Sequence, residues 1–157
     1  MTLKEQLNAD LRDAMRASED TRKTTLRLLL TAVRNAEIPP EGTTAVQRTD
    51  LDDDAVLGII RREVKQRRDS IDAYTKANRP DLAAKEEAEV VILAAYLPQQ
   101  MSRDEIVATA TAVIERLGAT GPADKGKVMP AVMAELKDRA EGREINAVVT
   151  ELLAARA

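Results

Sequence analysis

The sequence predicts an all-α protein, and three observations lead to that prediction. Apolar residues recur at steps of three, four and seven, the spacing of one helix face. Two capping boxes, Thr-Leu-Lys-Glu at residues 2–5 and Ser-Arg-Asp-Glu at residues 102–105, mark helix starts. No segment alternates apolar and polar residues as a half-buried strand does. We therefore predict a four-helix, bundle-like N-terminal domain over residues 1–97 and a small three-helix C-terminal domain over residues 98–157.

Turn formers and helix caps set the expected elements of the N-terminal domain. The second helix must stop before Pro39, and a long loop without periodicity follows over residues 38–50. Asp50 is expected to open the third helix, and Pro80 suits the first turn of the fourth, which ends at Pro98. The four helices are predicted at about residues 3–17, 20–38, 52–77 and 80–97. Their expected core residues are Leu3, Leu7, Leu11, Ala14, Met15, Leu26, Leu29, Leu30, Val33, Leu57, Ile60, Val64, Ile71 and Tyr74.

Glycines divide the C-terminal domain into three predicted helices. The first follows Ser102 and ends at Gly118, and the last runs over about residues 144–155. The middle helix is expected over about residues 125–140, ended by Gly142, with a start nearer Val128 if Pro130 has to lie in the first turn. Gly126 is a candidate for close packing at this start. Met129 and Met133, four residues apart, are predicted to lie in the core.

Composition excludes several classes of site. The 157 residues include no His and no Cys, which excludes Ser-His-Asp triads, thiol nucleophiles and zinc–thiolate centres. Tyr74 and Tyr96 are the only aromatic residues, too few for a base-stacking platform. We predict no catalytic residues, no metal site and no cofactor. The longest apolar run, Val90–Leu97, is too short to span a bilayer, and the first residues do not resemble a signal peptide. We therefore expect no membrane partner and a cytoplasmic location.

Three acidic or glycine-rich segments invite a chemical interpretation that their context does not favour. The segment from Gly121 to Lys127 has the spacing of a phosphate-binding P-loop, but Val128 replaces the magnesium-binding hydroxyl and a predicted helix precedes it. The acidic residues Glu86, Glu87 and Glu89 are predicted to form a solvated helix face, with Lys85 as the ion-pair partner of Glu89. The three consecutive aspartates at 52–54 are expected in a first helical turn, where the helix dipole favours negative charge.

Basic residues form three clusters although the net charge is only −3. Each cluster is a candidate phosphate-binding surface, and the alternative is a solubilising face paired with nearby acids. The first cluster is Arg61, Arg62, Lys65, Arg67 and Arg68; the second is Lys23, Arg27 and Arg34; the third is Lys125, Lys127, Lys137, Arg139 and Arg143.

The third cluster lies in a string that resembles a known family. Residues Gly126-Lys127-Val128-Met129, then Lys137-Asp138-Arg139-Ala140-Glu141-Gly142, then Ile145-Asn146, are similar to the signature of the YqeY family and to the tail domain of the B subunit of the aspartyl/glutamyl-tRNA amidotransferase. Further resemblance covers Glu63–Tyr74 and Tyr96–Ser102, so it extends over nearly the whole chain. It implies an all-helical, two-domain protein whose tail, like that of the amidotransferase subunit, helps to hold tRNA.

Three functions remain open at this point. The first is a tRNA-binding or amidotransferase-associated module without catalysis of its own, with tRNA or tRNA-charging proteins as partners and the third cluster as the RNA-binding residues. The second, which the family resemblance also implies, is a carbon–nitrogen ligase that uses glutamine as the amide donor. The third is a protein-interaction scaffold.

Overall fold

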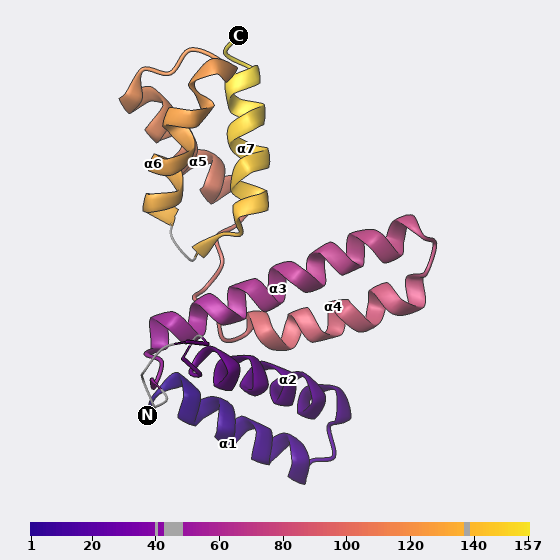
Figure 1. Ribbon diagram of the computed structural model, residues 1–157. Coiled ribbons are helices and arrows are strands. Elements are labelled where there is room, and N and C mark those ends of the chain that lie inside the picture. The colour runs from indigo at the N-terminus through magenta and orange to yellow at the C-terminus, as the bar shows by residue number, and fades with distance from the viewer. Residues whose placement is uncertain (40, 43–48, 137–138) are drawn as a thin grey trace. The chain divides into compact units, whose positions relative to one another are not determined.

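The computed structural model describes residues 1–39, 41–42, 49–136 and 139–157, which form seven α-helices, one short 3-10 helix and no strand (Figure 1). The predicted all-α class is confirmed. The chain divides into two compact units, Met1–Leu97 and Pro98–Ala157, and each unit has its own apolar core.

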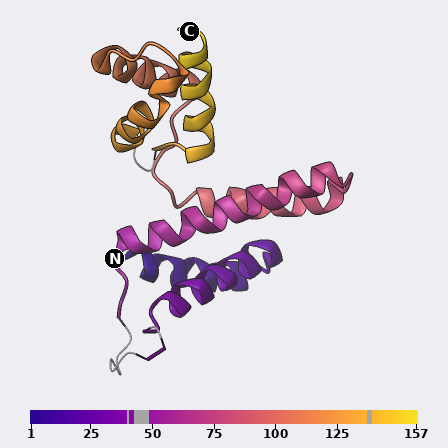
Figure 2. The same ribbon diagram turned by 45° about the horizontal axis from the view of Figure 1, so that its top comes forward.

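The N-terminal unit consists of two antiparallel helical hairpins. The first pairs α1 (Leu3–Arg16) with α2 (Asp20–Ala36), and the second pairs α3 (Asp53–Lys76) with α4 (Pro80–Ala94). Helix α2 packs against both helices of the second hairpin, and α1 also touches α3. Figures 1 and 2 show the second hairpin lying along α2 in both views.

Side-chain caps explain where α1 and α3 begin. Thr2 and Glu5 form the predicted capping box, and the side chain of Asp52 accepts a hydrogen bond from the backbone N–H of Ala55 at 2.8 Å. Asp52 is therefore the N-cap of α3, and the expectation that Asp50 opens this helix is wrong. Helix α4 begins at Pro80 as predicted but ends at Ala94, short of Pro98. The residue before a proline is disfavoured in helical geometry, so the helix closes before that point.

The predicted loop over residues 38–50 includes residues 40 and 43–48, which lie outside the described residues. Met15, predicted in the core, has 48% of its surface exposed. Ala14, one residue earlier, occupies the buried position of that turn instead. The buried core of the unit is Leu7, Ala14, Leu26, Leu29, Leu30, Val33, Val56, Ile59, Ile60, Val64, Val90 and Leu93.

The C-terminal unit packs three helices around a second core. They are α5 (Arg103–Leu117), α6 (Lys125–Leu136) and α7 (Gly142–Ala154), with a 3-10 turn, η1 (Pro122–Asp124), leading into α6. Each of the three helices packs against the other two. The core consists of Ile106, Ala110, Val113, Ile114, Ala119, Val128, Val132, Leu136, Ala140, Ile145, Val148, Val149 and Leu153.

Helix α5 has the clearest signals at both ends. Ser102 and Glu105 form the predicted capping box, in which the backbone N–H of Ser102 donates to the Glu105 carboxylate at 2.7 Å. The pKa of Glu105 is lowered, and this hydrogen bond is the main cause. Gly118 ends the helix in the left-handed region at φ +66°, a conformation in which a Cβ is unfavourable.

Several predictions about α6 and α7 are wrong. Helix α6 begins at Lys125, as predicted, but Pro130 lies inside the helix, so the alternative start near Val128 is wrong. Gly142 begins α7 rather than ending α6, and Arg139 and Ala140 lie outside both α-helices. A Cβ at Gly126 would meet nothing within 4 Å, so close packing does not require this glycine.

The prediction that Met133 lies in the core is wrong, because 46% of its surface is exposed. Met129 is partly buried and packs against the core of the C-terminal unit.

Replacing Ser102 by alanine tests how much the capping box contributes. The variant loses a side-chain oxygen that accepts from the Glu105 N–H, and N-cap losses of this kind cost about 1 kcal/mol. We expect this loss in the free energy of unfolding of the C-terminal unit, measured by circular dichroism in urea. Substituting Ser70, which is partly buried within α3 and caps no helix, is the control, and an equal effect there would contradict a specific role for the cap.

Candidate nucleic-acid interface in the C-terminal unit

The structure separates the predicted phosphate-binding residues into two groups. Lys125 and Lys127 lie in the first turn of α6, whereas Arg139 and Arg143 lie beyond its last residue, Leu136. From Lys127 to Leu136 the helix rises by about 14 Å. Lys137 lies outside the described residues.

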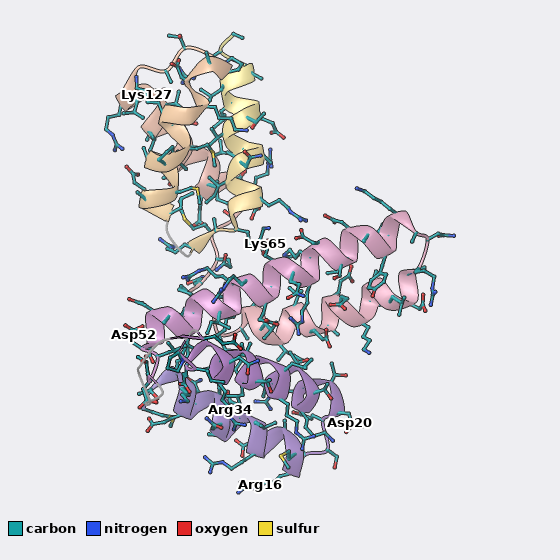
Figure 3. The ribbon with its side chains drawn as sticks, in the orientation of Figure 1. Arg16, Asp20, Arg34, Asp52, Lys65 and Lys127 are labelled. Atoms are coloured by element: carbon teal, nitrogen blue, oxygen red, sulfur yellow. The ribbon has the colours of Figure 1, made fainter. Side chains whose placement is uncertain are left out.

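Lys127 has a structural role at the end of a neighbouring helix. Its Nζ atom donates to the backbone carbonyl of Leu117, the last residue of α5, at 3.1 Å. A positive charge at this position also complements the negative end of the helix dipole. Asp124 lies nearby, and its pKa is lowered mainly by the backbone N–H of Thr120, with a smaller contribution from Lys127. Figure 3 shows where Lys127 lies in the C-terminal unit.

Arg139 and Arg143 flank the start of α7, and both are exposed. The backbone carbonyl of Arg139 accepts a hydrogen bond from the N–H of Met101 at 2.7 Å, which ties Arg139 to the residue just before the α5 cap. Arg143 is the second residue of α7, at the end of the helix that attracts anions. Glu141 and Glu144 lie in the same turn and offset part of this positive charge. We call Arg139 and Arg143 the junction arginines.

The two basic clusters of the N-terminal unit are partly used in ion pairs. Lys65 of α3 is 3.8 Å from Asp69, and Lys23 of α2 is 2.9 Å from Asp20. Figure 3 shows Lys65 on α3 and Arg34 on α2, so these clusters lie on different helices of the unit.

Arg67 does not belong to an exposed basic face, contrary to the prediction, because it is 8% exposed. Its Nη1 donates to the Glu63 carboxylate at 2.7 Å and to the Glu63 backbone carbonyl at 3.1 Å. Its Nε donates to the carboxylate of Glu89, on α4, at 3.3 Å. Glu89 is also buried and pairs with Arg67 rather than with Lys85, so the prediction of a solvated Glu89 is wrong. We call Glu63, Arg67 and Glu89 the buried triad.

The apolar stripes of the two helices contain the signal that predicts this triad. Arg67 follows Val64 by three residues and precedes Ile71 by four, which places it on the buried face of α3. Glu89 likewise precedes Leu93 by four residues on α4. A charged residue on a buried helix face needs a partner of opposite charge, and Arg67 and Glu89 provide this partner for each other.

The remaining motifs form neither a P-loop nor a metal site among the described residues. The stretch from Gly121 to Lys127 forms η1 and the start of α6, and α5 rather than a strand precedes it. Among the described residues, no three acidic side chains converge in a way that could hold a metal ion. No described helix has the length and apolar character needed to cross a membrane.

These features define a class of all-helical proteins with two compact units, each built around its own apolar core. The family model described as "Yqey-like protein" matches residues 4–153, and the chain belongs to the YqeY family.

Curated relatives carry the name "Altered inheritance of mitochondria protein 41, mitochondrial". The chain is 38% identical to the protein of Lachancea thermotolerans over 74% of its own length and 60% of the relative. It is 41% identical to that of Vanderwaltozyma polyspora over 58% of the chain and 46% of the relative, and 38% identical to that of Eremothecium gossypii over 73% and 60%. The chain thus spans between about half and three fifths of the length of these relatives.

The names of these relatives correct one prediction. All three are named as mitochondrial proteins, so the prediction of a cytoplasmic location is wrong on this finding.

Proposed function

We propose that the protein is a non-catalytic helical module that binds tRNA, alone or as part of a tRNA-charging assembly, through its C-terminal unit. The observation that carries the proposal is the resemblance of Gly126–Met129 and Lys137–Asn146 to the tRNA-holding tail of the amidotransferase B subunit. The exposed junction arginines lie in the second of these segments, next to the N-terminus of α7.

Phosphates are the expected point of contact. The C-terminal unit contains no aromatic side chain for base stacking, and Arg139 and Arg143 can each form charge-assisted hydrogen bonds with phosphate oxygens. Lys125 and Lys127 are the second group of expected donors, and Lys137 completes the set.

The variant that replaces both junction arginines by alanine tests this interface. We expect its affinity for unfractionated tRNA, measured by fluorescence anisotropy, to fall several-fold, because two phosphate contacts are lost. Both residues are exposed, so the circular dichroism melt should change little. Replacing Arg62 and Lys65, two exposed bases on α3, removes the same charge and should weaken binding less. Equal affinity of the junction variant and the wild type would refute the interface.

The carbon–nitrogen ligase is the alternative function, and it predicts a different result. Since the sequence lacks His and Cys and has Val128 at the magnesium-binding position, we expect no ATP hydrolysis and no ammonia release from glutamine by the purified protein. Coupled phosphate and ammonia assays measure both. Turnover that a single side-chain substitution abolishes would favour the ligase.

A further inference from the structure

The N-terminal unit contains a groove that the proposed tRNA interface does not use. It lies between α2 on one side and α3 and α4 on the other, and its volume is about 450 Å³. A water molecule occupies about 30 Å³ of the liquid, so the groove has room for more than a single small ion. Leu28 of α2 lines one wall and is 50% exposed, which leaves an apolar surface at the edge of the groove.

The opposite wall carries more negative than positive charge. Its ionisable residues are the buried triad together with Lys85 and Glu86, which amounts to three acids and two bases. Both carboxylates of the triad already bind Arg67, so the guanidinium offers little to an anionic ligand. Burial raises the pKa of Glu86, and the neighbouring Glu89 raises it further. Arg67 and Lys85 lower the pKa of Glu86, but they do not cancel the rise, so the positive charges around ionised Glu86 compensate it incompletely.

We infer that this groove binds a segment of a partner protein that places a Lys or Arg side chain beside Glu86 and an apolar side chain against Leu28. The positive charge complements the excess of carboxylates, and it relieves the repulsion between Glu86 and Glu89. Leu28 gains burial that it lacks in the isolated chain. A polypeptide provides both groups at a fixed spacing, whereas a free polyamine provides only the charge.

The test uses the full chain, labelled for NMR, and a synthetic peptide as the probe. The peptide is a capped, alanine-based helix with one arginine and one leucine four residues apart, and a matched peptide carries lysine instead. We expect saturable shifts of groove residues with both peptides. Glu86→Gln should weaken binding about fivefold, the effect of one partly exposed ion pair. Replacing Leu28 by serine should also weaken it.

Two controls separate binding from other effects. Glu87 is exposed on the same helix and does not line the groove, so Glu87→Gln removes the same charge and should leave the affinity unchanged. Glu86→Gln should be at least as stable as the wild type near neutral pH, since an acid with a raised pKa destabilises the fold when it ionises. A loss of peptide affinity in this variant therefore does not reflect unfolding.

Three results would overturn the inference. They are no saturable shift at millimolar peptide, equal weakening by Glu86→Gln and Glu87→Gln, and binding of spermidine as tight as that of the peptides. The variant without the junction arginines should bind the peptides normally, so failure here is distinct from failure of the tRNA interface.

Discussion

Replacing Arg67 by methionine is expected to lower the free energy of unfolding of the N-terminal unit by about 3 kcal/mol or more. The substitution leaves the buried carboxylate of Glu89 and the partly buried carboxylate of Glu63 without their common partner, and breaking a buried pair in this way costs about 3–5 kcal/mol. Because Glu63 retains 21% side-chain exposure, we expect the lower end of this range. Both tyrosines, Tyr74 and Tyr96, belong to this unit, so tyrosine fluorescence in urea measures its unfolding specifically.

Two further variants distinguish the loss of the ion pair from a general effect of charge. Lys65→Met removes one exposed positive charge from the same helix and should cost less than about 1 kcal/mol. Replacing Glu63 and Glu89 by glutamine in addition to Arg67→Met should restore part of the stability, since no uncompensated charge remains. Equal losses for Arg67→Met and Lys65→Met would show that the triad contributes no more than a surface pair.

Replacing Ile114 by alanine is expected to unfold the C-terminal unit at a lower temperature while the N-terminal unit keeps its own transition. Ile114 is fully buried on α5, the helix that packs against both α6 and α7. Such truncations cost about 2–5 kcal/mol, a large fraction of the stability of a unit of about 60 residues. Far-UV circular dichroism follows the helices of both units, and tyrosine fluorescence follows the N-terminal unit alone.

The exposed Met133 of α6 provides the matched substitution within the C-terminal unit. Met133→Ala should change the melt little, because the side chain is half exposed and alanine favours a helix. If Ile114→Ala shifts the fluorescence and circular dichroism transitions together, the two units unfold as one, contrary to the expectation from their separate cores.

The sequence predicts the class and most boundaries of this fold because the relevant signals are local. The capping boxes at Thr2 and Ser102, the left-handed Gly118 and the first-turn Pro80 each act within one turn of the chain. The buried stripe of α2 follows from helical spacing alone.

The errors arise where a distant contact decides. Whether Arg67 is exposed depends on Glu89, which lies on another helix, and local charge patterns favoured Lys85 as the partner of Glu89. Pro130 is a separate case, because the rule that confines proline to the first helical turn favours a start near Val128, whereas α6 begins at Lys125 with the proline inside it.

The candidate interface was predictable as a set of residues but not as an arrangement. Sequence order groups five basic residues in the C-terminal segment, yet α6 places Lys127 near the end of α5 and leaves Arg139 beyond its own last turn. The spacing of these residues along the chain does not predict how far apart they lie, because their separation depends on where α6 ends.

The proposed function is tested most directly by the dependence of tRNA affinity on salt. Because the junction arginines are expected to bind phosphates, log affinity should fall linearly with log salt between about 50 and 200 mM. Two phosphate contacts predict a slope of about −1.4 or steeper. Removal of both arginines should make the slope shallower by about 1.4–1.8. A wild-type affinity that does not change with salt, or a slope unaltered by the loss of both arginines, would contradict phosphate binding by this unit.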